Sequence, residues 1–482
     1  MSGFCKSTGE RNQPNEANGK VMETNTSEMA LKRGRGADRR AVWLVCIVSL
    51  SFLLHLVTRV LSGYAYGVMI TLFTMLFFAS KRITFRRGNR LAYLWLFSDV
   101  VLAVSFLRSQ RSNGALLDVI VFTCGFLLLL FYSEEETTYL RCLSAIKAFA
   151  IFFSAGVLFQ RFLPATYRSV VAVFPSDYRA ALGGGRAGFT PNTGYSAGYI
   201  IAGLLSCLSA FAARSSRLRL RRCIVPFCLA YALFLTGKRG PTLFAALTLV
   251  YCYLVPVKGS RKMRRYWRMF LIVGVLALCV WLFGESLSSI PVIGRFAESI
   301  SELSVGEDIT SGRLGLYRWA LQLFREHPML GIGWGRYRTT VVGNVTRVKS
   351  LETHNIYLQL LAETGIVGFL AFMTALLTFW SKSRAAYRDC ALRDDGGMRD
   401  WKRLLFFSHA YQTYFLLYGL TGNPLYDPHF QIMYIFSCMI YTAYASVAAR
   451  CTAQPCPPAE SASPAWATAR RRRAAVSVTV GR

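Results

Sequence analysis

The chain has 482 residues, of which 53% are hydrophobic, and a formal net charge of +31. Its apolar residues come in blocks long enough to cross a bilayer, which excludes an ordinary soluble domain and predicts an all-α, polytopic integral membrane protein. The basic residues fall mainly in short connections between these blocks, so the charge follows the positive-inside pattern and does not indicate nucleic-acid binding. The 13 cysteines lack the spacing of a disulfide framework or a zinc site.

The chain order predicts five parts. Residues 1–40 are polar, lack a signal peptide and end in a basic run, so we expect a disordered cytoplasmic N-terminus. Residues 41–284 hold spans one to nine, residues 285–364 a large outer loop, and residues 365–448 spans ten to twelve. Residues 449–482 are predicted to be a disordered cytoplasmic tail. The predicted spans, about twelve in all, lie near 41–60, 62–80, 91–107, 115–132, 145–163, 194–213, 222–236, 240–257, 268–284, 365–380, 404–420 and 430–448.

The orientation follows from the short loops. With the N-terminus inside, Lys and Arg concentrate in inner connections at 81–90, 214–222, 258–268 and 382–403. An acidic inner loop at 133–144 departs from this pattern. Four segments are predicted to lie outside, at 164–193, 236–240, 285–364 and 421–429.

Two short helices are predicted in the outer loop. Thr310 or Ser311 is placed to cap a helix over 313–326, and Pro328 to end it. Leu314, Tyr317, Leu321 and Phe324 share one face of this helix. The Gly-rich run at 331–335 predicts a tight turn.

The second helix is predicted to begin at His354 and Asn355, with Thr353 as its cap and Gly365 as its end. Arg313 and His354 would each lie in a first helical turn, where backbone N–H groups favour an anion. Nearby positive charge would keep His354 neutral, as a base requires. The simpler alternative is that Arg313 pairs with a carboxylate and His354 only caps its helix.

The loop also carries a resemblance. Gly312-Arg313, the helix with Trp319, His327-Pro328, Gly331-Ile332-Gly333, and the segment from Thr353-His354-Asn355 to Glu363-Thr364-Gly365 resemble the periplasmic loop of the O-antigen ligase and polymerase superfamily. The resemblance implies a GT-C-like membrane fold and a metal-independent, inverting glycosyltransferase without a cofactor. Its donor would be a glycan linked to undecaprenyl diphosphate.

The resemblance also assigns site residues. Arg239 matches an arginine that contacts the diphosphate, and Lys238 stands where a serine is usual. Arg186 and Asn192 match a Gly-rich segment that contacts donor phosphate or sugar. Arg239, Arg313 and His354 are therefore the predicted catalytic residues, and Lys238, Arg186 and Asn192 the predicted substrate-binding residues. A lipid-facing Lys-Arg pair and a stray loop arginine are the alternatives, and His429 is a reserve base.

These observations predict an enzyme of the bacterial inner membrane with its active site facing the periplasm. Its leading acceptor is the lipid A–core oligosaccharide, which would make it an O-antigen ligase. The alternatives are an O-antigen or exopolysaccharide polymerase, a protein O-oligosaccharyltransferase and, in a different class, an anion transporter that uses Arg239 and Arg313. Its partners would be the lipid-linked donor, the glycan acceptor and membrane lipid, with no nucleic acid.

Overall fold

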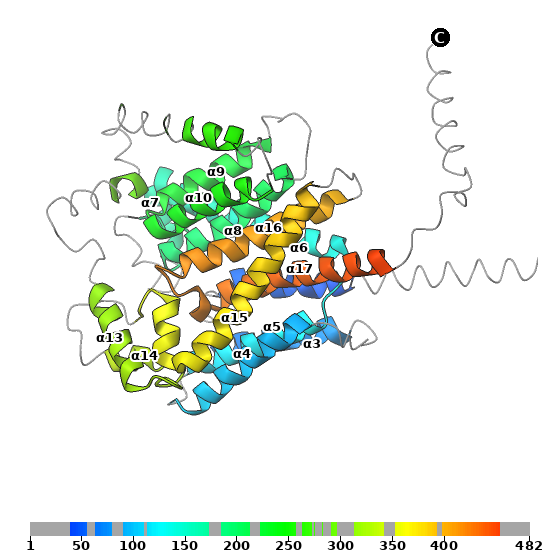
Figure 1. Cartoon of the computed structure of the whole chain (residues 1–482). Coiled ribbons are helices and arrows are strands. Elements are labelled where there is room, and N and C mark those ends of the chain that lie inside the picture. The colour runs from blue at the N-terminus through cyan, green and yellow to red at the C-terminus, as the bar shows by residue number, and fades with distance from the viewer. Residues whose placement is uncertain are drawn as a thin grey trace, which may run out of the picture. The chain divides into compact units, whose positions relative to one another are not determined.

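The fold is helical throughout the part of the chain that the structure describes (Figure 1). This computed structural model describes residues 39–54, 63–79, 90–109, 113–172, 185–212, 222–256, 263–271, 274, 282, 291–295, 313–341, 352–392 and 398–453. The all-α prediction is confirmed. The helices are α3 (Gly63–Ala79), α4 (Arg90–Leu107), α5 (Asn113–Leu130), α6 (Glu136–Phe162), α7 (Pro164–Val171), α8 (Thr193–Ala212), α9 (Ile224–Leu235), α10 (Arg239–Leu254), α13 (Arg313–Glu326), α14 (Tyr337–Val341), α15 (Ile356–Leu392), α16 (Arg399–Tyr418), the 3-10 helix η4 (Pro424–Tyr426) and α17 (Pro428–Ala453).

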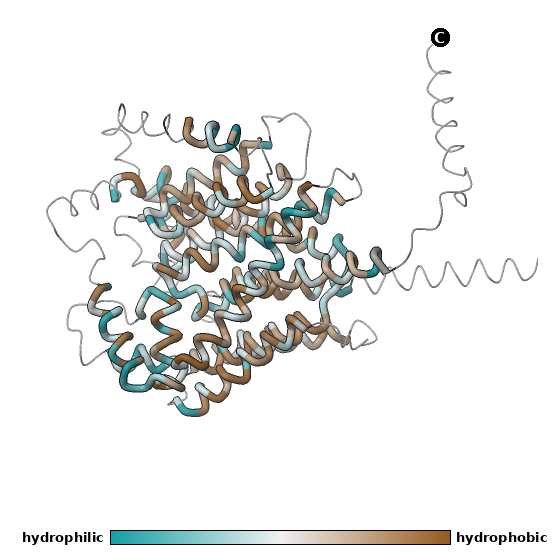
Figure 2. The backbone as a smooth tube through the Cα atoms, viewed as in Figure 1, coloured by the Kyte–Doolittle hydropathy of each residue, from teal (hydrophilic) through white to brown (hydrophobic). Residues whose placement is uncertain are grey.

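Apolar helices make up most of the fold. Four helices among the described residues are long and apolar enough to cross a membrane: Glu136–Phe162, Thr193–Ala212, Ile356–Leu392 and Pro428–Arg450. Shorter apolar helices accompany them, and the hydrophobic colour of Figure 2 follows these elements, whereas α13 and α14 carry more hydrophilic residues. These properties are those of a multi-pass membrane protein. The count of about twelve spans stays a prediction, since most of 268–284 lies outside the described residues.

Several helices extend beyond their predicted boundaries. α6 begins at Glu136 and so takes up much of the acidic connection that was expected to be a loop. α15 joins the helix predicted before Gly365 to the span predicted after it and runs to Leu392, well past the predicted end of that span at residue 380. Hydropathy alone misses these extensions because amphipathic turns at the ends of a span resemble loop sequence.

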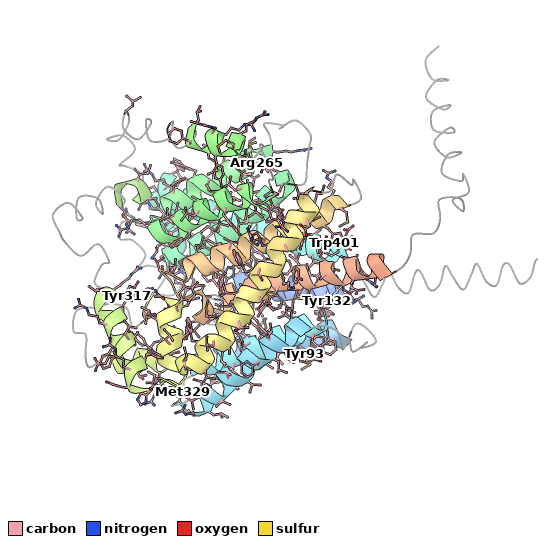
Figure 3. All side chains as sticks on the ribbon, viewed as in Figure 1. Tyr93, Tyr132, Arg265, Tyr317, Met329 and Trp401 are labelled. Carbon is pink, nitrogen blue, oxygen red and sulfur yellow. The ribbon has the colours of Figure 1, made fainter. Side chains whose placement is uncertain are left out.

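α15 links the outer-loop helices to the rest of the fold (Figure 1). It packs against α4 and α16 along its length and against α13 and α14 near its start. A second group is formed by α6, α8 and α9, and α16 packs on both α8 and α10. In Figure 3, Tyr317 and Met329 lie at one end of the fold and Tyr132 and Trp401 at the other. The predicted outer loop, with Tyr317 and Met329, therefore lies at the end opposite to Trp401 of a predicted inner connection and to Tyr132, at the inner end of a predicted span.

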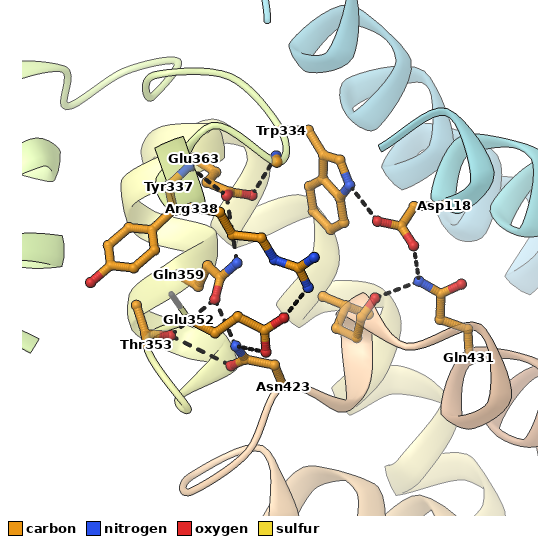
Figure 4. A network of polar contacts seen from close by, with 12 residues as sticks. Asp118, Trp334, Tyr337, Arg338, Glu352, Thr353, Gln359, Glu363, Asn423 and Gln431 are labelled. Carbon is orange, nitrogen blue, oxygen red and sulfur yellow. Dashed lines mark hydrogen bonds and ion pairs between the residues drawn. The ribbon is translucent and has the colours of Figure 1, made fainter. Parts of the chain in front are cut away.

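Trp334, in the Gly-rich turn, anchors the outer loop in the helical core. Its indole is fully buried and stacks on Tyr426, with ring centroids 4.3 Å apart. The indole N–H donates to Asp118 Oδ2 of α5 over 3.0 Å (Figure 4). A buried aromatic ring with a satisfied donor fixes the turn firmly to the bundle.

Two glycines let the turn and α15 touch through their backbones. The N–H of Ile332 donates to Ala362 O (3.0 Å), and that of Ile366 donates to Pro328 O (2.8 Å). Gly331 and Gly365 both have positive φ, 62° and 63°. A Cβ on Gly365 would lie 2.4 Å from the Met329 carbonyl carbon. α15 therefore breaks at Gly365, and the predicted turn at 331–335 is confirmed.

Gly365→Ala should lower the free energy of unfolding by roughly 2–5 kcal/mol, because it combines a strained backbone with a backbone clash. Gly315→Ala is the matched control. A Cβ there meets nothing within 4 Å, and alanine in a helix interior should stabilise by about 0.5–1 kcal/mol. Thermal unfolding in detergent measures the stability of both variants. Equal unfolding midpoints for Gly365→Ala and wild type would contradict the requirement for glycine at the break in α15.

Candidate functional site

The first side of the candidate site is the N-terminus of α13. The helix runs over Arg313–Glu326 as predicted, with Arg313 as its first residue. The predicted caps at 310 and 311 lie outside the described residues. The predicted apolar face is not the buried one: Leu316, Ala320 and Leu323 are buried, whereas Leu314 and Leu321 are 44% and 40% exposed. In a membrane protein, an apolar residue on the surface can face lipid, so apolar spacing alone does not identify the packed face.

The second side is the loop that carries His354, and here the predicted helix start is wrong. α15 begins at Ile356, and Asn355 is the cap, since its Oδ1 accepts the N–H groups of Tyr357 (3.0 Å) and Leu358 (3.1 Å). Thr353 instead accepts the N–H of Asn355 (3.1 Å) in a local turn. His354 therefore lies before the helix, with φ at 53°. This left-handed conformation is uncommon for a residue with a side chain.

The third side is the turn between α9 and α10. Lys238 occupies the N-cap position of α10 without a side-chain cap hydrogen bond, and Arg239 begins the helix. Gly237 has φ at 71°. The Gly-rich segment lies directly on this turn: the Arg186 N–H donates to Leu235 O over 3.1 Å. A Cβ on Gly185 would lie 2.4 Å from Thr236 O.

These three sides meet around His354. Burial, followed by the positive charges of Arg313 and Lys238, lowers the pKa of His354 from 6.5 to about 4. The imidazole is therefore neutral at pH 7, as predicted. Burial and the charges of Arg295 and Arg313 likewise lower the pKa of the Lys238 ammonium. The charges act on one another across segments that are far apart in the sequence.

Thr421, just after α16, joins two of the sides. The Arg313 guanidinium donates to Thr421 O over 3.2 Å. A Cβ on Gly240, in the first turn of α10, would lie 2.8 Å from Thr421 Oγ1. The N-termini of α10 and α13 therefore approach the same residue, and each presents backbone N–H groups that suit an anion.

Three cations of the site, Lys238, Arg239 and Arg313, have no carboxylate partner among the described residues. The ion pairs within 4.0 Å in this part of the chain involve Arg40, Arg338, Arg388 and Arg403, and not Lys238, Arg239 or Arg313. The Nε of Arg186 and the hydroxyl of Thr421 are buried without a hydrogen-bond partner there. The pairing of Arg313 with a carboxylate, considered above as the simpler alternative, is therefore not seen among the described residues. Uncompensated cations at two helix N-termini form an anion-binding arrangement.

Arg295 belongs to this cluster and was missed by the sequence analysis. Its Nη1 donates to Gly237 O over 3.1 Å, and the Arg239 Nη1 donates to Arg295 O over 2.9 Å. These reciprocal bonds hold the short helical stretch 291–295 against the 237–239 turn. No local motif marks Arg295, since its role depends on a contact with residues more than fifty positions earlier in the chain.

Asn192 lies at the border of the site, whereas His429 differs from its predicted setting. The Asn192 Oδ1 accepts the Gly194 N–H over 2.8 Å, as a cap at the start of α8 does. A Cβ on Gly194 would lie 3.8 Å from Lys238 Cε, so this helix start borders the site. His429 was predicted to face outward, but it is fully buried between Phe52 and Tyr199. Its depth in the core removes the reason for choosing it as a reserve base.

Fold and site together define a multi-pass helical membrane protein with a cationic, histidine-containing site between α13, the α9–α10 turn and the loop before α15. A model of the O-antigen ligase family matches residues 224–373, from α9 into α15. The resemblance to the O-antigen ligase superfamily is therefore confirmed. The matched segment contains Lys238, Arg239, Arg295, Arg313 and His354. No curated protein matches the chain. Over residues 224–373 the chain is thus similar to the O-antigen ligase family of glycosyl-transferring enzymes, and its apolar helices are those of a membrane protein.

Lys238→Gln should raise the pKa of His354, because it removes a positive charge that disfavours the imidazolium. The value should stay below 6.5, since burial remains the largest cause. The pH dependence of diethyl pyrocarbonate modification of His354, read by mass spectrometry, reports this pKa because the neutral ring reacts. Lys147→Gln in α6 is the control. An unchanged midpoint in Lys238→Gln would place Lys238 too far from the imidazole to act on it.

Proposed function

We propose that this protein is an inner-membrane glycosyltransferase that moves a glycan from undecaprenyl diphosphate to an acceptor hydroxyl. The observation that carries the proposal is that Lys238 and Arg313 lie close enough to His354 to lower its pKa, with Arg239 next to Lys238 at the start of α10 and no carboxylate paired with these three cations among the described residues. A diphosphate is the anion that fits this arrangement, because several fixed cations can share its charge.

The proposed reaction is a single displacement. The unprotonated ring nitrogen of His354 takes the proton of the acceptor hydroxyl, and the acceptor oxygen forms a bond to the anomeric carbon of the glycan. The bond from that carbon to the diphosphate oxygen breaks, and the diphosphate leaves with the electron pair. Attack opposite to the leaving group inverts the configuration at the anomeric carbon. A neutral imidazole at pH 7 is ready to accept the proton.

The cations would stabilise the charge that develops on the leaving group. Arg313, at the start of α13, and Lys238 and Arg239, at the start of α10, combine side-chain charge with the N–H groups of two helices. Charge from side chains and helix ends can neutralise a diphosphate without a divalent ion, so we propose a metal-independent reaction. Arg186 and Asn192 border the same turn and are proposed to contact the donor.

The membrane setting completes the proposal. About twelve spans would place the loop of residues 285–364 on the periplasmic side, where the polyprenyl chain of the donor can remain in the bilayer. We propose the lipid A–core oligosaccharide as the acceptor, which makes the protein an O-antigen ligase. Reconstitution with undecaprenyl-diphosphate glycan and lipid A–core tests this. Extension of the lipid-linked glycan instead would favour a polymerase, and glycan on Ser or Thr a protein O-oligosaccharyltransferase.

His354→Asn should abolish detectable transfer, since removing a positioned base costs about 10²–10⁴-fold in rate. Asparagine is the matched substitution because it tolerates the left-handed backbone of this position and lacks a base. Donor binding and protein level should stay near wild type. Single-turnover transfer and a donor-binding assay check this. Near-wild-type transfer by His354→Asn would show that His354 is not the base. If the variant retains uptake of an anion and the protein shows no transfer, a transporter is favoured.

Arg313→Ala should lower the transfer rate by about 10²-fold or more, since it removes a donor to the leaving diphosphate. Arg313→Lys should recover only part of the rate, because an ammonium cannot make the bidentate contact of a guanidinium. Arg318→Ala, an exposed arginine of the same helix, is the control and should leave the rate near wild type. Arg239→Ala and Arg239→Lys should follow the Arg313 pair. Full activity in both lysine variants would show that only the positive charge of Arg239 and Arg313 is needed, and not the shape of the guanidinium.

A further inference from the structure

One stretch of chain, residues 419–423, contacts both Arg313 and the loop of His354. The Ile356 N–H donates to Gly419 O over 2.9 Å, and the Asn355 Nδ2 donates to Leu420 O over 3.3 Å. The next carbonyl, that of Thr421, accepts the Arg313 guanidinium over 3.2 Å. Three consecutive carbonyls of one segment therefore hold the start of α15 and the first residue of α13.

Asn423 continues this row with its side chain (Figure 4). Its Nδ2 donates to Gln359 Oε1 over 2.8 Å and to Glu352 Oε2 over 3.0 Å. Glu352 and Gln359 lie on either side of His354 in the sequence. Asn423 is 8% exposed and Gln359 is fully buried. One buried amide thus joins the segment before His354 to the first turn of α15 after it.

The network extends from there to the Gly-rich turn. Glu352 forms an ion pair with Arg338 of α14. The Gln359 Nε2 lies 3.5 Å from Glu363 Oε1, and the Glu363 carboxylate accepts the N–H groups of Gly335 (2.9 Å) and Tyr337 (3.0 Å) (Figure 4). A buried polar network in which each group has a partner favours one arrangement of its segments.

The histidine loop, defined here as residues 352–355, needs such support. The left-handed backbone of His354 is a conformation that persists only where surrounding contacts determine it. The 40 residues 314–353 separate it from Arg313 along the chain, so sequence proximity does not set their spacing. The spacing is set where both segments contact residues 419–423.

We propose that residues 419–423 set the position of the base relative to the cation, and that Asn423 is the positioning residue for His354. Asn423 would act through the loop and without touching the substrate. This proposal rests on the proposed function for its kinetic consequence, because a base displaced by about 1 Å can lose about 10²-fold in rate. Its structural consequence, the setting of the imidazole, holds independently of the reaction.

Asn423→Asp tests the proposal at almost constant volume. It replaces the donor Nδ2 with an oxygen that faces the two acceptors on Glu352 and Gln359, so both hydrogen bonds are lost. We expect kcat to fall about 10- to 100-fold while the donor KM stays within about 3-fold. Adding Glu352→Gln supplies a donor to the new carboxylate and should recover part of the loss. Glu352→Gln alone keeps the Asn423 donor and an acceptor oxygen at position 352, so its kcat should stay closer to wild type than that of Asn423→Asp.

The second readout is the rate of diethyl pyrocarbonate modification of His354 at pH 7, which needs no glycan substrate. Asn423→Asp should change this rate, and the double variant should restore it toward wild type. Gln412→Leu is the matched control. Gln412 is a buried amide of α16 that bonds to Ser408 and Ser383, away from the site, so both the modification rate and kcat should stay near wild type.

The outcomes separate the two proposals. A wild-type protein that transfers no glycan refutes the proposed function, while an altered His354 modification rate in Asn423→Asp still supports positioning. Wild-type kcat and a wild-type modification rate in Asn423→Asp overturn the positioning proposal. So does a change of kcat and of the His354 modification rate in Gln412→Leu as large as that in Asn423→Asp. If Asn423→Asp does not accumulate in the membrane, Asn423→Ser, which keeps a shorter donor, is measured in its place with the same criteria.

Discussion

Repulsion of the Lys238 ammonium by Arg295 and Arg313 is the constraint around which the site is organised. Burial and these two charges lower the pKa of Lys238, and burial and the charges of Arg313 and Lys238 lower the pKa of His354. Such a cluster persists because the surrounding backbone holds each member: Gly237 O accepts Arg295, Arg295 O accepts Arg239, and Thr421 O accepts Arg313. Main-chain carbonyls offer partial negative charge without neutralising the cations. The site thereby remains strongly attractive to an anion.

The same repulsion prepares the imidazole. A histidine in water is partly protonated near neutral pH, but burial and neighbouring cations keep His354 neutral here. An incoming diphosphate would counter the effect of the cations and so make proton uptake by His354 more favourable once the donor is bound. Under the proposed function, donor binding and the basicity of the histidine would therefore be coupled through the electrostatics of one site.

Local sequence features predicted the local structure well. Arg313–Glu326 is a helix because its residues favour one and Pro328 follows it, and glycines at 331, 333 and 335 have the positive φ that the turn requires. The start of α15 was misplaced by two residues because Thr353 and Asn355 are both good caps, and only the tertiary contact of Asn355 with Leu420 favours the second. Arg295 and Asn423 could not be assigned from sequence, since their partners lie far along the chain and no spacing rule connects them.

The break of α15 at Gly365 has a consequence for the lipid environment. Residues 356–364 meet the apolar stretch beyond them at this break, and backbone bonds join residues 328–333 to both sides of it. A long apolar helix tilts when the bilayer is thinner than its hydrophobic length. A change of tilt would carry the Asn355 cap and the neighbouring His354 with it. Membrane thickness would thus act on the geometry of the reaction, and lipids with shorter or longer acyl chains would set how fast the protein works.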